Sequence, residues 1–311
     1  MWRALYLALA IGWMAPASIL MNDAVGVGGF DASVRVGNGT GTVFMSSLNG
    51  NLLMMCIITA DHVLGDTPPA TVGIRGSGNG GFDITAMSSS QMRKGPTGTE
   101  DVAFVNVTVD LTKVTEAQAG VLKGIMGVPL AAAPGATPFD ITAYGYGATA
   151  RPATADEKLQ YMGAIYVDPL ADPAFAYGVE RTYKASISTL DTYNKKDYKY
   201  PQMNYSFMNK GDGLGLGGDS GEGLISNNKI VGVYATSGGT YFSSSNGMPC
   251  TKGTDGCDVL AINQGTIGSG VALTSDDVTW FDAACPEPAS FALLGIGLAL
   301  LSLAKAKELW L

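Results

Sequence analysis

The sequence predicts an all-β protein, built as a barrel or as a sandwich. Short runs rich in β-branched and aromatic residues recur along the chain, and Gly or Pro separates them. Stretches with the apolar period of a helix are scarce. The 311 residues are 46% hydrophobic and only 15% charged, which is enough apolar material for one large or two small domains with a sizeable core.

The charge balance argues against a nucleic-acid partner. The formal net charge is −8, and no basic stripe runs through the sequence. A small cluster of lysines at 194–199 has the composition of a solvated loop. Nucleic-acid binding requires a concentrated positive surface, so no nucleic acid is expected to bind.

Residues 1–17 are predicted to be an export signal. Arg3 supplies the positive start, Ala4–Met14 the short apolar core, and Ala15–Ala17 a small-residue cleavage site. Cleavage after Ala24 and a buried N-terminal strand or helix are the alternatives. Export would place the rest of the chain in an oxidising compartment, where disulfides persist.

The first predicted strands lead to the only histidine of the chain. Phe30–Val43 is expected to form two short strands around a Gly/Asn turn, and Leu52–Thr59 a buried strand. His62 follows that strand, and the turn signal Gly65–Pro69 comes next. A lone histidine is more often structural, but this position at a strand end favours a catalytic role.

Asp101 is the candidate partner of this histidine. It directly precedes the alternating strand pattern of Val102–Val109. A repeated Phe-Asp-Ile-Thr tetrapeptide at 82–85 and 139–142 marks two further strand starts. The alternative for Asp101 is an exposed aspartate in a turn.

A glycine-rich segment, Gly211–Gly223, surrounds Ser220 and leads to the strand-like run Ile230–Tyr234. Glycines allow tight turns with positive φ, which leave a hydroxyl exposed with backbone N–H groups beside it. That arrangement suits a nucleophilic Ser220 and an oxyanion held by the amides of Gly218 and Ser220. The alternative is a flexible surface loop.

Three segments resemble the trypsin/chymotrypsin-like serine peptidases: Gly218–Gly221 the nucleophile motif, Ile57–Val63 the histidine segment, and Thr99–Val107 the aspartate strand. The triad of that family appears in the order His, Asp, Ser. The resemblance implies two six-stranded antiparallel β-barrels with the active site between them and a short C-terminal helix. The implied peptidase domain covers residues 25–284.

The resemblance also assigns roles to single residues. Ser220 would attack the scissile carbonyl, His62 would act as base and then as acid, and Asp101 would orient His62. Leu214 would form the base of the primary specificity pocket, where it favours apolar substrate side chains over Lys or Arg. The implied wall of that pocket consists of Ser237, Gly238 and Gly239.

Two acidic residues qualify the resemblance. Asp61 stands where the family has a small residue, and a carboxylate there is expected to raise the pKa of His62 or to compete for its N–H. In many members of the family, the aspartate before the serine, here Asp219, pairs with a freed N-terminus. Because no Arg or Lys directly precedes Val25–Phe30, we expect an internal partner for Asp219 instead.

The second half of the chain resembles the family in islands. Ile141–Gly147 is similar to the start of the second barrel, and Gly270–Asp282 to the last strand and helix, with Thr274 or Ser275 as N-cap. Residues 148–210 match nothing and are expected to form long loops interrupted by strands, such as Gly163–Val167.

The four cysteines favour one short disulfide. Cys250 and Cys257 are the natural pair because they close a short loop, although two unpaired thiols are the alternative. Cys56 is expected to be a small buried hydrophobic residue. No spacing is typical of a zinc site, and neither metal nor organic cofactor is expected.

The C-terminal segment 285–311 resembles the PEP-CTERM sorting signal of exported Gram-negative proteins. A Pro-Glu-Pro sequence precedes the apolar run Phe291–Ala304, and Lys305 and Lys307 follow. The run is short for a membrane span. The resemblance implies a membrane-attached C-terminal helix and sorting or processing machinery as a partner; an ordinary anchor helix is the alternative.

Together these features predict an exported serine endopeptidase of the bacterial cell envelope or exterior, acting on proteins or peptides through an acyl-enzyme. The rival hypothesis is a catalytically idle relative that serves as a surface-binding or matrix protein, because a fold does not fix a function.

Overall fold

The computed structural model of the chain describes residues 30–37, 39–75, 81–98, 100–147, 151–152, 155–156, 166–169, 180–195, 198–206, 215, 219–238, 241–243, 249–250, 259–262 and 267–285. The predicted export signal and the sorting segment beyond Cys285 lie outside these ranges. Within them, no helix is long and apolar enough to cross a membrane.

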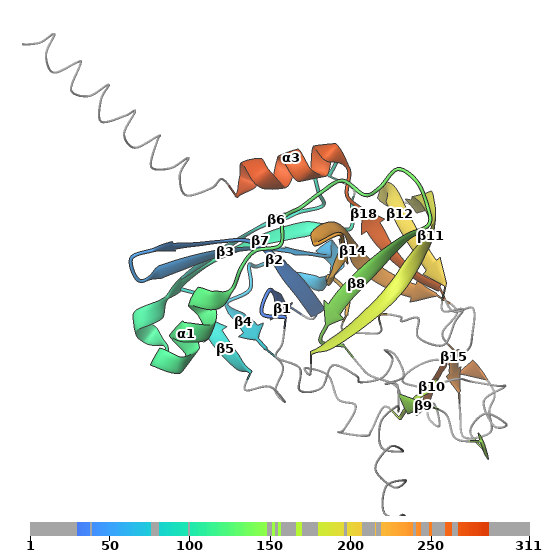
Figure 1. The fold of residues 1–311 in the computed structure, drawn as a ribbon, viewed down its shortest axis with the longest axis horizontal. Coiled ribbons are helices and arrows are strands. Elements are labelled where there is room, and N and C mark those ends of the chain that lie inside the picture. Colours follow the sequence, from blue (N-terminus) through green and yellow to red (C-terminus); the bar gives the residue numbers. More distant parts are fainter. Residues whose placement is uncertain are drawn as a thin grey trace, which may run out of the picture.

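The N-terminal half forms an antiparallel sheet of seven strands in the order β5-β4-β1-β2-β3-β7-β6 (Figure 1). Its strands are β1 (Ser33–Val36), β2 (Gly39–Asn49), β3 (Leu52–Thr59), β4 (Thr71–Ile74), β5 (Phe82–Thr85), β6 (Ser88–Arg93) and β7 (Ala103–Asp110). The predicted strand at 52–59 is confirmed with its bounds, and the predicted hairpin before it becomes β1 and β2.

The C-terminal half is a closed six-stranded barrel in the order β11-β12-β18-β14-β13-β8. Its strands are β8 (Phe139–Gly145), β11 (Arg181–Lys195), β12 (Tyr198–Ser206), β13 (Gly223–Ser226), β14 (Lys229–Gly238) and β18 (Ile267–Ala272). A third, smaller sheet has the order β16-β15-β17-β10-β9. It comprises β9 (Arg151–Pro152), β10 (Tyr166–Pro169), β15 (Tyr241–Ser243), β16 (Pro249–Cys250) and β17 (Val259–Ile262).

The predicted all-β, chymotrypsin-like fold class is confirmed, with one structural difference in its first half. The second unit is a closed six-stranded barrel, whereas the first is a half-barrel whose end strands β5 and β6 each pair with one described neighbour. Both end strands are rich in exposed polar side chains, which suits strands with an unpaired edge.

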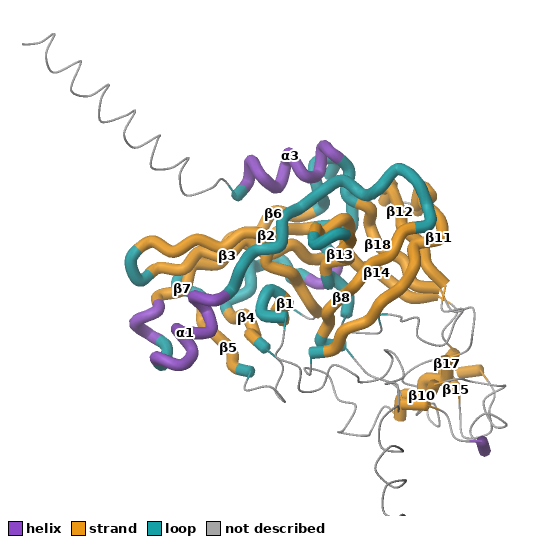
Figure 2. The backbone as a smooth tube through the Cα atoms, in the orientation of Figure 1, coloured by secondary structure: helices purple, strands orange, loops and turns teal. Residues whose placement is uncertain are grey.

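In the described part of the chain, helices are few and short, as Figure 2 shows by colour. The named ones are α1 (Glu116–Gly124), α3 (Ser275–Ala284) and the 3₁₀ turns η1 (Asp61–Val63) and η3 (Leu111–Lys113), and residues 155–156 are also helical. Helix α3 is the predicted C-terminal helix, and Thr274 is its N-cap through a capping box with Asp277. Its Phe281 is fully buried against Phe44 of β2 and Phe104 of β7, so the end of the chain packs onto the first half.

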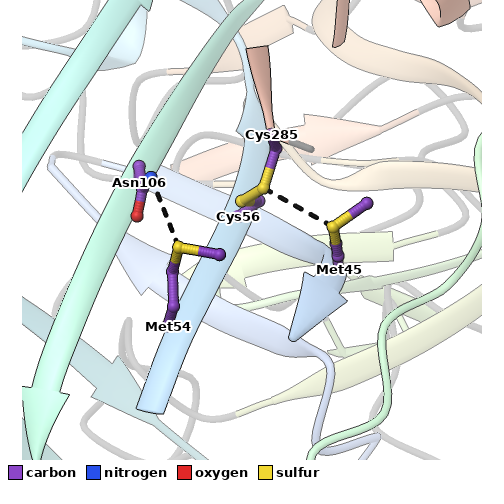
Figure 3. The surroundings of a disulfide bond; sticks show 5 residues. All are labelled: Met45, Met54, Cys56, Asn106 and Cys285. Carbon is purple, nitrogen blue, oxygen red and sulfur yellow. Dashed lines mark hydrogen bonds between the residues drawn. A yellow bond between two sulfur atoms is a disulfide. The ribbon is translucent and has the colours of Figure 1, made fainter. Parts of the chain in front are cut away.

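A disulfide links β3 to the residue that follows α3. Cys56 of β3 is bonded to Cys285, the residue after α3, with 6.4 Å between their Cα atoms (Figure 3). Cys56 is fully buried, as expected, but it forms a disulfide rather than serving only as a small hydrophobic residue. The packing of α3 brings together two cysteines that are 229 residues apart, which sequence spacing does not reveal. Cys257 lies outside the described residues, so its bond to Cys250 stays a prediction.

The segment expected to consist mainly of loops contains the longest hairpin of the barrel. Strands β11 and β12 pair from Ile187↔Tyr205 to Lys195↔Tyr198. Buried Tyr183, Ala185 and Ile187 alternate along β11 with exposed side chains, the pattern of a strand with one face in a core. The strand predicted at 163–167 overlaps β10 in its last two residues.

Candidate active site

The turn that carries His62 follows directly from the end of β3. Ala60 is extended, with φ −81° and ψ 144°, and Asp61–Val63 then makes a single 3₁₀ turn. Val63 is buried beneath this turn, while the His62 side chain remains 43% exposed. The buried strand and Val63 therefore hold the backbone and leave the imidazole accessible to solvent.

Strand register brings Asp101 to this turn. Thr59 at the end of β3 pairs with Ala103 at the start of β7, so the residues just beyond them lie side by side. The backbone N–H of His62 donates to Asp101 Oδ1 at 3.0 Å, and His62 Nδ1 lies 2.8 Å from Asp101 Oδ2. Because a carboxylate only accepts, Nδ1 carries the proton and Nε2 is left as the free base in the neutral ring.

The surroundings of His62 favour its protonated form. Its pKa lies above the usual 6.5, mainly because of the hydrogen bond to Asp101. Burial opposes this rise, and the charges of Asp101 and Asp61 add to it. The predicted effect of Asp61 on the ring is therefore present, but it is the smallest of these contributions.

Backbone contacts place Ser220 at the junction of the two halves. Its carbonyl accepts the N–H of Thr40 at the start of β2, with 2.9 Å between the two atoms. The next residue, Gly221, has φ +94°, and a Cβ there would overlap the carbonyl oxygen of Thr40 and the hydroxyl of Thr59. Only glycine fits at this position. The close approach puts the turn Asp219–Glu222, called the serine loop below, against the end of β3 that leads to His62.

The hydroxyl of Ser220 is hydrogen-bonded to the barrel. It donates to the carbonyl oxygen of Ala235 in β14 at 3.4 Å, and within the described residues it makes no hydrogen bond to His62. A serine hydroxyl changes direction by rotation about one bond. In ligand-free sites such contacts are commonly long and tighten when substrate binds.

Two acidic side chains of the serine loop lie buried. Asp219 accepts the backbone N–H of Gly147 at 2.7 Å, which is the kind of internal partner that the sequence led us to expect. Glu222 is fully buried and accepts a short hydrogen bond from the hydroxyl of Tyr183. Burial, followed by the charge of Asp219, raises the pKa of Glu222 well above its usual value.

The sequence left open that Asp61 competes for the N–H of His62. In the structure Asp61 does not accept this N–H. Its buried carboxylate binds the guanidinium of Arg93 in β6, with Arg93 Nε 2.7 Å from Oδ1 and Nη2 3.2 Å from Oδ2. Sequence reasoning missed both Arg93 and Glu222. Asp61 itself was the available signal, because a buried carboxylate requires a partner.

The predicted specificity pocket is only partly within the described residues. Leu214, Gly218 and Gly239 lie outside them, so the pocket base and one oxyanion amide remain predictions. Ser237 and Gly238 lie in β14, paired with Gly268 and Ile267 of β18. No group of three or more His, Cys, Asp or Glu in the described part of the chain is placed to hold a metal ion.

Comparison with known proteins yields structural neighbours but no sequence relative. No family model matches the chain, and no curated protein matches it. Human heparin binding protein aligns at 12% identity over 83% of this chain and 94% of its own, with a TM-score of 0.46. Neuropsin, a serine protease of mouse brain, aligns at 12% identity over 78% of this chain and 89% of its own, with a TM-score of 0.41. The fold assignment rests on the half-barrel, the closed barrel and the C-terminal helix described above.

Proposed function

We propose that this protein is a serine endopeptidase that uses Ser220, His62 and Asp101 as a catalytic triad. The observation that carries the proposal is the double contact of Asp101 with both the ring and the backbone N–H of His62. It fixes the tautomer with a free Nε2 and resists rotation of the ring. The approach of Gly221 to Thr59 supports a Ser220 close to that ring.

The proposed reaction proceeds through an acyl-enzyme. Ser220 Oγ attacks the scissile carbonyl while His62 Nε2 takes its proton and then delivers it to the leaving amine. Asp101 stabilises the imidazolium formed between these steps. The backbone N–H groups of Gly218 and Ser220 would donate to the oxyanion. Water then attacks the ester, and His62 again acts first as base and then as acid.

From the sequence we also propose a substrate class and a location. A pocket with Leu214 at its base and Ser237, Gly238 and Gly239 along its wall would accept Leu, Met or Phe before the cut. A cation there would lack a partner, and burying it would cost several kcal/mol, so Lys and Arg would be rejected. Export by residues 1–17 and sorting by 285–311 would bring the enzyme to the envelope.

The second candidate is a catalytically idle binding protein with the same fold. The hydrogen bond of Ser220 to Ala235, instead of to His62, is the observation that favours it. This candidate binds peptides in the cleft and forms no covalent intermediate. The two functions therefore differ in whether Ser220 reacts.

Labelling with a fluorophosphonate decides between them. The mature wild-type chain is expected to take up one equivalent of reagent at Ser220, located by peptide mass mapping, and to hydrolyse peptide esters. S220A should abolish both signals. S186A, which removes an exposed hydroxyl on the outside of β11, is the matched control and should retain both. Labelling that persists in S220A would exclude Ser220 as the nucleophile.

A further inference from the structure

One arginine spans the turn that holds the histidine. Besides its two contacts with the carboxylate of Asp61, Arg93 Nη2 donates to the backbone carbonyl of Asp61 at 3.3 Å. Arg93 Nη1 donates to the carbonyl of Gly65, also at 3.3 Å. A single guanidinium thus binds the residue before His62 and the third residue after it. The planar fork of arginine makes such a set of contacts possible, and the point charge of lysine does not.

The register of three strands explains why these groups meet. Ala103 pairs with Thr59 of β3 on one side and with Arg93 of β6 on the other. Asp61 lies two residues beyond Thr59, and Asp101 two residues before Ala103. Both carboxylates therefore leave the sheet at the same end, next to His62. Arg93 comes from the adjacent edge strand and reaches Asp61 across this end.

The local charges require such a partner. The charged groups that act on the His62 ring are Asp101, which binds it, and Asp61, which precedes it in its own turn. The Asp61 side chain is 3% exposed, so its charge is scarcely screened by water. Asp66 lies 3.5 Å from Arg93 but is fully exposed, and it contributes little by comparison. Arg93 is the cation that faces the Asp61 carboxylate beside the histidine.

We propose that Arg93 is a positioning residue: by occupying both oxygens of Asp61, it leaves Asp101 as the carboxylate that binds the His62 ring. Its effect on catalysis rests on the proposed function, whereas its effect on the titration of His62 does not. The sequence offers a direct readout, since His62 is the only histidine. Its ring resonances in an NMR titration of the full chain are free of overlap from other histidines.

Charge substitutions on the two partners should move the titration of His62 in opposite directions. R93M leaves the negative charge of Asp61 unbalanced and should raise the pKa of His62 by roughly half a pH unit or more. D61N removes the anion and leaves the cation, so it should lower that pKa. The double variant D61N/R93M removes both and should return close to wild type. R93K retains the charge without the fork and should restore the titration only in part.

The activity profile should follow the titration. Because the base must be neutral, a higher pKa in R93M should lower kcat/KM about 3-fold or more at pH 6, with recovery toward pH 9. The matched control is R75M, which breaks a two-contact Arg75–Asp31 pair at 2.6 and 2.9 Å, next to the ends of β4 and β1 in the same half. R75M should lower stability and leave the titration of His62 unchanged.

Two results would overturn the proposal. One is a folded R93M whose His62 titrates within about 0.1 pH unit of wild type. The other, decisive if R93M does not fold, is a D61N chain whose His62 titrates no lower than wild type. All titrations are repeated in an S220A background. If the His62 pKa shifts in this background while the wild-type protein does not react with the fluorophosphonate, the role of Arg93 is supported and the peptidase function is rejected.

Discussion

At the scale of single residues, four acidic side chains around the histidine and the serine loop have different partners. These pairs are Asp101 with the His62 ring, Asp61 with Arg93, Asp219 with the N–H of Gly147, and Glu222 with the hydroxyl of Tyr183. A cation, a histidine, an amide and a hydroxyl stabilise charge to different degrees. For Glu222, burial outweighs the hydrogen bond from Tyr183, and its pKa is raised.

The hydrogen bond of Asp101 fixes the direction of the pH dependence of activity. This bond raises the pKa of His62 above 6.5. As the pH rises, the neutral imidazole should accumulate and kcat/KM should increase, both with a midpoint above pH 6.5. D101N should lower kcat by about 10⁴-fold, because the amide no longer selects the tautomer with a free Nε2. It should also lower the His62 midpoint. A wild-type midpoint below 6.5, from rates and NMR on the same sample, would contradict this assignment.

Glu222 should make the protein less stable as the pH rises. Its pKa is raised in the folded state, so above the ordinary value of 4.5 the folded chain binds more protons than the unfolded chain. The stability linked to this proton is complete below 4.5 and is lost as the pH rises through the folded-state pKa. E222Q should therefore raise the free energy of unfolding at pH 8, with little gain at pH 4.

Urea unfolding at both pH values tests this prediction. Y183F is the control, since it removes the hydroxyl donor to Glu222 and should lower stability by about 1–3 kcal/mol at pH 8. Equal effects of E222Q at pH 4 and pH 8 would show that Glu222 does not titrate between them.

The residues found from sequence and the residues missed differ in the range of their interactions. His62, Asp101 and Ser220 each stand in a short segment with local pattern, and their roles came from a resemblance. Arg93 is 32 positions from Asp61, and Tyr183 is 39 from Glu222. Those contacts arise from strand register and barrel closure, which a single sequence does not encode in local patterns.

At the scale of elements, capping residues in the sequence predicted the start of α3, and the same signal is present at α1. Thr274 and Asp277 form a capping box at α3, as the sequence suggested. Thr115 and Gln118 form the same box at α1, which we did not predict. Helix α1 is short, contains Gly120, and buries only Leu122, so it lacks the apolar period that marks most helices. The cap was its only local signal.

The cap of α3 should contribute measurably to stability. Thr274 accepts the backbone N–H of Asp277 at 3.2 Å, and T274A leaves that donor without its side-chain partner. The free energy of unfolding should fall by about 1 kcal/mol. In the same helix the exposed Thr279 hydroxyl donates to the carbonyl of Ser275, a bond that adds little because that carbonyl already lies within the helix. T279A should therefore change stability by less than ~0.5 kcal/mol, and equal losses in both variants would reject the cap.

The β11–β12 hairpin was missed for a different reason. Pro201 lies inside β12, opposite Thr192, and lysines and tyrosines surround the connection. Proline and clustered charge usually mark loops in sequence. Here the neighbouring strands β8 and β18 complete the barrel on either side, and tertiary pairing overrides that local preference.

At the scale of the whole molecule, the two halves are connected directly at the candidate site. Ser33 of β1 donates to the carbonyl of Tyr144 in β8, and the hydroxyl of Tyr146 donates back to the carbonyl of Ser33, both at 2.8 Å. The backbone N–H of Tyr146 donates to the hydroxyl of Thr40 at 3.1 Å. The N–H of Thr40 donates to the carbonyl of Ser220, and the Thr40 carbonyl accepts the hydroxyl of Thr59 at the end of β3, so Thr40 contacts both the serine loop and the strand that leads to His62.

The second connection is the disulfide from Cys56 to Cys285, and its loss should destabilise the protein as a whole. Closing a loop of 229 residues restricts the unfolded chain, which gives the bond a stabilising contribution of roughly 2–5 kcal/mol. C56V/C285A removes the bond while valine fills most of the space of the buried sulfur. Its free energy of unfolding should fall by that amount, and the amides of α3 should exchange faster, because the helix is then held by packing alone.

The single variant C285A separates the bond from the packing around it. It breaks the same bond but leaves the buried Cys56 side chain in place, so its loss should match that of the double variant within ~0.5 kcal/mol. The triad contacts of His62 depend on β3 and β7, whose hydrogen-bonded ladder remains intact without the bond. Hydrolysis at 25 °C should therefore persist in both variants while thermal inactivation accelerates. A loss below about 1 kcal/mol in both would mean that the packing of α3, and not the disulfide, holds the end of the chain against β3.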